Sequence, residues 1–174
     1  DNSIDVSCNG GSDGSLEVVG TGGVAGFQYS IDGGVTFQSS GDFTGLSAGN
    51  YIITVEDANG CQVTVTVPIT EPTLLIGTVS STTDASCGFA NGSFTVQAVD
   101  GTPGYQYSID GGVTWQSTGV FSNVFPGSYL VNIEDVNNCG TTLNVVINDL
   151  SGITASISSQ TEVSCNGFND GDVT

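Results

Sequence analysis

The stretch QYSIDGGVTWQSTG, residues 106–119, decides the fold because the chain contains it twice. Residues 28–41, QYSIDGGVTFQSSG, are identical to it at 12 of 14 positions. A second stretch, GNYIITVEDANGC at 49–61, returns as GSYLVNIEDVNNC at 127–139. Both pairs are offset by 78 residues, so the sequence is a tandem repeat with a period of about 78 residues.

The repeat divides the chain into three parts. EPTLLIGTVSS at 71–81 has its counterpart in LSGITASISS at 150–159, and each stretch leads into a cysteine. We therefore expect a first repeat over 1–70 that lacks its opening strand, a complete second repeat over 71–149, and the start of a third over 150–174. This arrangement is typical of a segment from a longer array.

Alternating apolar residues predict antiparallel strands within each repeat. Tyr51, Ile53 and Val55 share one face of a predicted strand, as do Val63 and Val65 of the next. In the second repeat we expect strands over 73–79, 93–99, 104–109, 113–117, 128–134 and 140–147. This spacing predicts an all-β fold of small antiparallel β-sandwiches, immunoglobulin-like in size, one for each repeat. A propeller blade needs only roughly 40–50 residues, so the period argues against a propeller.

The charge balance excludes several functions. The 174 residues include 18 Asp and Glu and no Lys, Arg or His. Nucleic-acid binding is not expected, because no side chain can neutralise a phosphate. The side chains form no salt bridges, so packing, hydrogen bonds and disulfides must hold the fold. No apolar run reaches the ~18 residues of a membrane span, so we expect no transmembrane segment in this sequence.

The stretch that opened this section contains a motif at equivalent positions of both repeats: Ser30, Asp32, Gly34, Thr36 and Phe37, and then Ser108, Asp110, Gly112, Thr114 and Trp115. It resembles the Asp-box, which is best known from sialidase propellers. Asp-Gly between two strands is a hairpin signal, and an Asp carboxylate can accept N–H groups across such a turn. We interpret the motif as a structural hairpin.

Catalysis is not expected. A sialidase holds the carboxylate of its substrate with arginines, which this chain lacks, and general bases built on His or Lys are also excluded. Only carboxylate pairs of the glycosidase type remain. Glu56 and Asp57, like Glu134 and Asp135, are neighbours along a predicted strand, so their side chains point to opposite faces.

Five cysteines at matched positions predict one disulfide in each repeat. We pair Cys8 with Cys61 and Cys87 with Cys139, and we expect Cys165 to bond a partner beyond residue 174. An alternative bond between Cys61 and Cys87 would link neighbouring repeats. Disulfides indicate an oxidising location outside the cytoplasm.

The turns before the second cysteine of each repeat are candidate calcium sites. DANG at 57–60 and DVNN at 135–138 supply carboxylate and amide oxygens, the ligands that Ca²⁺ prefers. The first ligands to test are Asp57, Asn59, Asp135 and Asn137. Ordinary Asx-turns are the alternative interpretation, and no other cofactor is expected.

The order of these signals resembles the SprB-repeat family. The resemblance rests on matching stretches in both repeats, among them Ser7-Cys8, Asp13-Gly14-Ser15, Asn59-Gly60-Cys61, Gly92-Ser93 and Pro126-Gly127-Ser128-Tyr129. The second repeat departs from it with Asn91 in place of Asp and Asn138 in place of Gly. SprB repeats occur in very long surface adhesins of gliding and other Bacteroidota. The resemblance implies type IX secretion, display on the outer surface and filament-like extension.

These observations predict a non-enzymatic structural and adhesive segment of a long cell-surface or extracellular filament protein. Its expected partners are neighbouring repeats, other copies of the chain, and a surface glycan or substratum. One alternative is a Ca²⁺-dependent module that binds a glycan or a partner. Another is a self-assembling filament, in which the edge strand of one chain completes the sandwich of the next.

Overall fold

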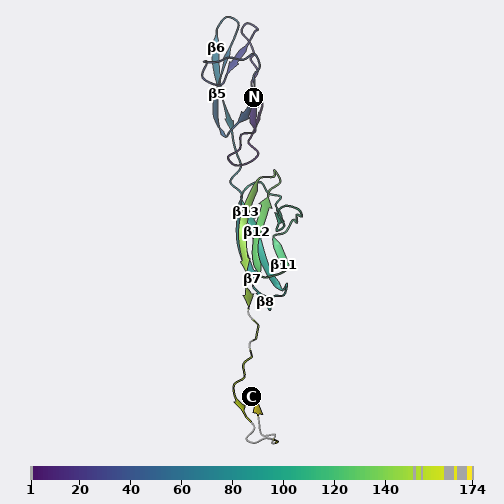
Figure 1. Ribbon diagram of the computed structural model, residues 1–174. Helices are drawn as coiled ribbons and strands as arrows, with labels where there is room; N and C mark the ends of the chain where they lie inside the picture. Colours follow the sequence, from purple (N-terminus) through teal and green to yellow (C-terminus); the bar gives the residue numbers. More distant parts are fainter. Residues whose placement is uncertain (1, 151, 154, 163–166, 168–171, 174) are drawn as a thin grey trace.

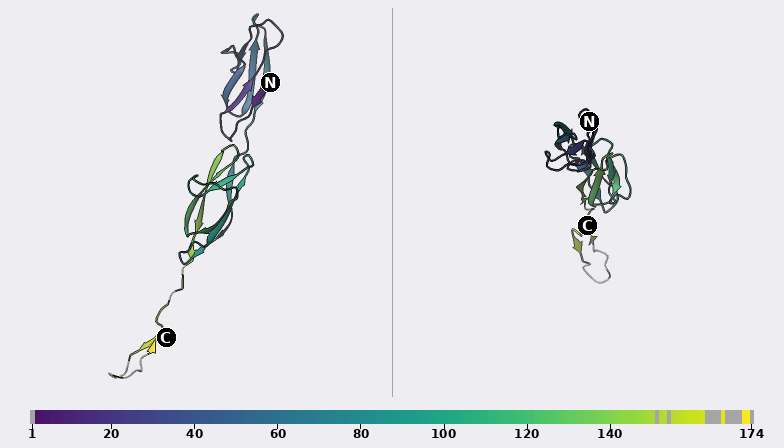
Figure 2. Two further views of the ribbon diagram at one scale, coloured as in Figure 1. Left: turned by 90° about the vertical axis from the view of Figure 1, so that its right-hand side faces the viewer. Right: turned by 90° about the horizontal axis from the view of Figure 1, so that it is seen from above.

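The computed structural model describes residues 2–150, 152–153, 155–162, 167 and 172–173. Two β-sandwiches lie end to end along one long axis, and the described residues after Leu150 lie beyond the second (Figures 1 and 2). Every regular element in the described residues is a strand, which confirms the all-β prediction. None of the described residues form a helix that is long and apolar enough to cross a membrane.

The first unit consists of two antiparallel three-stranded sheets. One contains β1 (Asn2–Ile4), β2 (Gly14–Glu17) and β4 (Asp42–Leu46), in the order β1-β2-β4. The other contains β3 (Gln28–Ser30), β5 (Gly49–Glu56) and β6 (Gln62–Ile69), in the order β3-β5-β6. The hairpin of β5 and β6 pairs along its whole length, from Gly49 opposite Ile69 to Glu56 opposite Gln62.

The second unit repeats this topology. One sheet has the order β11-β9-β7, with strands β11 (Val120–Val124), β9 (Gly92–Val99) and β7 (Ile76–Thr83). The other has the order β10-β12-β13, with strands β10 (Gln106–Ser108), β12 (Gly127–Glu134) and β13 (Gly140–Ile147). A short parallel pair joins β8 (Ala85–Ser86) to β14 (Asp149–Leu150). After the second unit, β15 (Gln160–Thr161) pairs with β16 (Asp172–Val173).

Each unit has its own core, and the two cores share no residue. The apolar side chains that alternate along the strands point between the two sheets, as the sequence pattern predicts. In the second unit Phe94 is 1% exposed, and its ring centroid lies 5.0 Å from that of Phe121 and 5.5 Å from that of Tyr129. Ile53 of the first unit and its counterpart Val131 are both fully buried.

One expected strand is absent, and one observed strand was not expected. The stretch 113–117 forms turns with a single bridge, Tyr107 opposite Gln116, and β11 follows it as a strand that the sequence did not indicate. The reason is local: the Asp110 carboxylate accepts the N–H groups of Val113 and Thr114, so these groups cannot enter a strand ladder.

The repeat limits also differ in detail from the expected ones. The first unit was expected to lack its opening strand, but β1 supplies the last three residues of that strand. Leu150, expected at the start of the third repeat, pairs with Ser86 of the second unit through β14. The division of the chain into three repeats otherwise stays a prediction.

Candidate functional site: the junction between the two units

The cysteines of a repeat lie at opposite ends of its sandwich. Cys8 lies near the end of the first unit that faces the second unit, where the N–H of Val6 donates to the carbonyl of Thr70 at 2.9 Å. Cys61 closes the β5–β6 turn at the far end, and its carbonyl accepts the N–H of Asp57 at 3.0 Å. The eight residues of β6 separate the two ends by about 26 Å at ~3.3 Å per residue.

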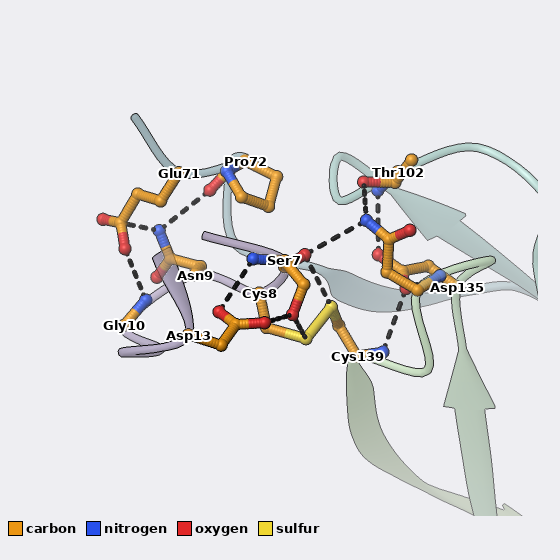
Figure 3. Close-up of a disulfide and its surroundings, with 11 residues drawn as sticks. Ser7, Cys8, Asn9, Gly10, Asp13, Glu71, Pro72, Thr102, Asp135 and Cys139 are labelled. Atoms are coloured by element: carbon orange, nitrogen blue, oxygen red, sulfur yellow. Dashed lines mark hydrogen bonds between the residues drawn. A yellow bond between two sulfur atoms is a disulfide. The ribbon is translucent and has the colours of Figure 1, made fainter. Parts of the chain in front are cut away.

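The structure joins Cys8 of the first unit to Cys139 of the second (Figure 3). The sulfur atoms are 2.05 Å apart, the Cα atoms are 5.5 Å apart, and the bond spans 131 residues of sequence. It therefore links two sandwiches instead of closing a loop within one.

Both expected pairings within a repeat, Cys8 with Cys61 and Cys87 with Cys139, are therefore wrong. A disulfide needs Cα atoms within about 7 Å, and the two ends of one sandwich are much farther apart. The alternative bond between Cys61 and Cys87 is also absent, because these residues lie at the two outer ends of the stack, where both thiols are free and exposed. Cys165 lies outside the described residues.

Hydrogen bonds reinforce the junction beside the disulfide. The side-chain amide of Asn137 donates to the carbonyl of Ser7 at 3.1 Å and to the Thr102 hydroxyl at 3.2 Å. Ser7 is itself held by Asp13, whose carboxylate accepts the backbone N–H of Ser7 at 3.0 Å and also the hydroxyl. These bonds to Ser7 keep the pKa of Asp13 below its ordinary value.

The linker between the units is tied to the same turn. The Asn9 side-chain amide donates to the Glu71 carboxylate at 3.2 Å and to the carbonyl of Pro72 at 3.1 Å (Figure 3). The other Glu71 oxygen accepts the N–H of Gly10 at 2.5 Å. The linker therefore leaves the first unit along a defined path, next to the disulfide.

The sequence did not point to Ser7 or Asn137 as junction residues, although Asn137 was considered as a calcium ligand. The strand lengths could have revealed the disulfide. A cysteine before the first long strand of a repeat and a cysteine in the hairpin turn between its last two strands must lie at opposite ends of a sandwich. End-to-end stacking then brings the first cysteine of one repeat to the second cysteine of the next.

The Asp-box hairpin is a self-contained hydrogen-bond network. In the second unit, Asp110 accepts the N–H groups of Val113 and Thr114 at 3.1 and 2.9 Å, and the Thr114 hydroxyl at 2.6 Å. The Ser108 hydroxyl donates to Asp110 at 2.7 Å and accepts the N–H of Gly112 at 2.9 Å. The Trp115 indole N–H donates to the Gly112 carbonyl at 3.0 Å, which places the ring over the turn.

The first unit carries the same network. Asp32 accepts the Ser30 hydroxyl at 2.6 Å and the N–H of Thr36 at 2.9 Å, and Ser30 accepts the N–H of Gly34 at 2.8 Å. Phe37 stands in place of the tryptophan, without an N–H to donate. Bonds from the hydroxyls of Ser30 and Thr36 hold the pKa of Asp32 well below its ordinary value. The side-chain polar groups of Ser30, Asp32 and Thr36 are thus all used within the turn.

The candidate calcium residues cap their own turns. Asp57 accepts the N–H groups of Val24, Asn59 and Cys61 at 3.0, 2.9 and 2.9 Å, and the bond from Val24 is the main reason that its pKa is lowered. Asp135 is 2% exposed.

Asp135 accepts the N–H groups of Thr102, Asn137 and Cys139, each at 2.9 Å. Within the described part of the chain, no group of three or more His, Cys, Asp or Glu is placed to hold a metal ion. Calcium binding stays a prediction.

The carboxylate neighbours considered for catalysis lie in different structural settings. Glu56 ends β5 and accepts the side-chain amide of Gln62 at 2.5 Å, whereas Asp57 accepts backbone N–H groups within its turn. Glu134 ends β12, and Asp135 is buried under its own turn. Glu56, Asp57 and Asp135 therefore serve as acceptors for structural hydrogen bonds.

The fold and the junction together define the class of protein. The chain consists of tandem antiparallel β-sandwiches that are joined end to end by a disulfide. The family model described as "SprB repeat" matches residues 1–36 and 79–114, one segment in each unit. Each match runs from the opening strand into the Asp-box and ends at Thr36 or Thr114, one residue before the aromatic residue of the motif. These two matches confirm the resemblance to the SprB-repeat family. Such repeats fit a surface protein of the adhesin type.

A search of curated proteins found no match. Among solved structures, the chain is similar to the human desmocollin-1 ectodomain, with 16% identity and a TM-score of 0.30. The similarity covers 75% of this chain and 31% of that one, so the chain spans less than a third of the desmocollin structure. A similarity of this strength carries no argument about function.

Proposed function

We propose that the chain is a non-enzymatic stalk segment of a long surface adhesin, in which stacked repeats supply reach and disulfides keep the stack extended. The observation that carries the proposal is the Cys8–Cys139 bond. A disulfide within one sandwich would stabilise that sandwich alone. A disulfide between two sandwiches adds a second covalent attachment to the linker and limits bending between them.

The hairpins support the same role. Loops that bind ligands usually present free polar groups, whereas the Asp-box residues Asp32 and Asp110 are engaged by their own turns. The absence of Lys and Arg gives the stalk a net charge of −18, which keeps neighbouring stalks apart by repulsion. Export by type IX secretion, attachment at the outer membrane and a role in gliding belong to the proposal and are supported by the SprB-repeat match.

The test uses cells that produce the protein. Antibodies against the two-unit chain should label intact, non-permeabilised cells by immunogold electron microscopy, with the label at a distance from the membrane. Attachment of these cells to a surface should fall when the gene is deleted. Labelling that appears only after permeabilisation would contradict the proposal.

A further inference from the structure

The second unit has an open pocket of about 660 Å³ on the β10-β12-β13 sheet, beside the Asp-box hairpin. Sites for small molecules usually measure about 300–1,000 Å³, and the pocket falls within this range. All of its lining residues lie between Gly111 and Thr142, inside a sandwich whose strands β7 to β13 are all described. No described residue of the first unit lines it.

Strands β12 and β13 supply a polar floor. Asn132 and Glu134 alternate along β12 with Ile133, which is fully buried, so the two polar side chains point away from the core. On β13, Thr142 lies opposite Asn132. Gly140 lies opposite Glu134 in the same register. The floor is therefore the outer face of the sheet, the face that does not pack on the other sheet.

Trp115 forms a side wall beside this floor. Its indole N–H donates to the Gly112 carbonyl at 3.0 Å, and a Cβ on Gly112 would lie 3.3 Å from Trp115 Cζ2. The ring is thus packed on the Asp-box turn, yet it is only half-buried and lines the pocket. The hairpin therefore holds an aromatic surface in a fixed position next to the polar groups.

The polar groups of the floor have no partner within the fold. The side chains of Asn132, Glu134 and Thr142 make no hydrogen bond with any described residue. The Asp-box carboxylates differ in this respect, because their own turns engage them. Donors and acceptors that the fold leaves unused are available to a ligand.

The first unit shows how the same place is closed. The residues 78 positions before Gly140 and Glu134 are Gln62 and Glu56. The side-chain amide of Gln62 donates to the Glu56 carboxylate at 2.5 Å, so it covers the carboxylate that Gly140 leaves open in the second unit. Two units with the same sheet and the same hairpin therefore differ at the floor of this pocket.

The lining fits the chemistry of a sugar. A pyranose ring presents C–H groups on its faces, which pack on an aromatic ring, and hydroxyls at its edge, which both donate and accept. The side chains of Asn132 and Thr142 also donate and accept, and the Glu134 carboxylate accepts strong bonds from hydroxyls.

Other ligand classes fit less well. An acidic sugar would meet the Glu134 carboxylate in a chain with a net charge of −18 and no Lys or Arg to balance it. A small organic cation could use the Trp115 ring and Glu134, but it would offer no acceptor to the amide N–H groups of Asn132. The observations therefore favour a neutral saccharide.

We propose that this pocket binds a neutral saccharide, with one pyranose ring stacked on Trp115 and its hydroxyls bonded to Asn132, Glu134 and Thr142. The inference goes beyond the stalk function, because it gives the side of the stalk a ligand. Repeats stack end to end, so a pocket on a sheet face stays open in the stack. A unit closed as the first one is by Gln62 then acts as a spacer between binding units.

The first experiment uses Trp115 as the reporter, because it is the single tryptophan of the chain. The chain is titrated with cellotetraose, maltotetraose, mannotetraose and tetra-N-acetylchitotetraose while the tryptophan fluorescence is followed. We expect a saturable change with at least one of these neutral oligosaccharides, with a dissociation constant on the order of 1 mM or below. The absence of a saturable change with all of them would overturn the proposal.

Gly140→Gln copies the residue of the first unit and tests the site directly. A Cβ on Gly140 would lie 3.8 Å from Glu134 Cγ and 3.9 Å from the Ile133 carbonyl oxygen, which are ordinary contact distances, so the fold should tolerate the change. We expect binding to weaken at least about tenfold, because the new side chain covers the Glu134 carboxylate. Wild-type affinity in this variant, with an unchanged near-ultraviolet circular dichroism spectrum, would overturn the proposal.

A second pair of variants tests the carboxylate itself. Glu134→Gln keeps the shape of the side chain and should weaken binding by about threefold to tenfold, because a neutral acceptor forms weaker bonds. Glu56→Gln is the matched control in the first unit and should leave binding unchanged. Equal losses in the two variants would show that the saccharide binds elsewhere.

A titration with tetramethylammonium chloride separates a sugar site from a cation site. We expect no saturable change in Trp115 fluorescence at constant ionic strength. A saturable response to this cation together with none to the oligosaccharides would assign the pocket to cations and overturn the proposal. None of these results bears on surface display, which the immunogold experiment tests separately.

Discussion

The sulfur of Cys8 is bonded to that of Cys139, so the first unit is attached to the second at two points, by the disulfide and by the linker that starts at Glu71. One attachment would allow the units to swing about it. Two attachments side by side leave a smaller range of angles. The extended shape in Figure 1 is therefore built into the junction.

Removal of this bond should loosen the junction without unfolding either unit. We expect Cys139→Ser to broaden the distribution of molecular dimensions in small-angle X-ray scattering, while near-ultraviolet circular dichroism stays unchanged. The matched control is Cys61→Ser, which removes the equivalent thiol of the first unit where no bond exists. If both variants scatter as the wild type does, the disulfide does not limit bending.

The fold could be predicted largely from local pattern. The 78-residue period, the alternation along β5 and β6 and the Asp-Gly turns each depend on residues close in sequence. The disulfide could not be assigned in this way, because its two cysteines belong to different repeats. Cysteines at matched positions of each repeat indicate that the same bond recurs along the chain. Whether that bond lies within one repeat or between two depends on which end of the sandwich each cysteine occupies.

Phe94 should carry much of the stability of the second unit. It is 1% exposed and contacts the rings of Phe121 and Tyr129. We expect Phe94→Ala to lower the free energy of unfolding of this unit by about 3–5 kcal/mol. Phe89→Ala is the control, because Phe89 is 66% exposed and should change stability by less than about 0.5 kcal/mol. Thermal unfolding should then show the second unit melting below the first, and a single unshifted transition would contradict this.

The Asp-box shows where local pattern misleads. The chain turns at Asp110 and returns to a single bridge between Tyr107 and Gln116, but the predicted return strand was not found over 113–117. The carboxylate that forms the turn also takes the N–H groups that a strand would need. When an Asp caps a turn in this way, the next strand begins several residues farther along the chain, and here it begins at Val120.

The same carboxylates make stability depend on pH. The hydroxyl and N–H of Thr114, followed by the Ser108 hydroxyl, lower the pKa of Asp110 from 3.8 to about 2. A group whose pKa is lower in the folded state stabilises the fold above its unfolded pKa, and this contribution is lost as pH falls through the folded pKa. We therefore expect the unfolding temperature to fall between about pH 4 and pH 2.

The variant Asp110→Asn isolates this contribution. It should unfold at a lower temperature than the wild type at pH 7, because the neutral amide is a weaker acceptor for Thr114. The difference should shrink as the pH falls to 2 and below, because Asp110 of the wild type takes up its proton in this range. The measurements need high salt throughout, so that repulsion among the 18 acidic residues is screened. A difference that stays constant with pH would show that the charge of Asp110 is not what stabilises the hairpin.

Asp135 and Asp57 allow the calcium prediction to be tested against their capping role. The role predicts that Asp135→Asn lowers the free energy of unfolding by about 1–3 kcal/mol, because the buried N–H groups of Thr102, Asn137 and Cys139 lose their anionic acceptor. Asp57→Asn should lower the free energy of unfolding by a smaller amount, because Asp57 is only half-buried.

Calcium binding predicts something different for the same variants. An ion held by these turns would raise the unfolding temperature of the wild-type chain in proportion to the logarithm of its concentration, and a chelator would reverse the rise. The rise should be smaller in each Asp→Asn variant. An unfolding temperature that does not respond to millimolar Ca²⁺ beyond its response to the same ionic strength of Na⁺ would leave capping as the sole role of both carboxylates.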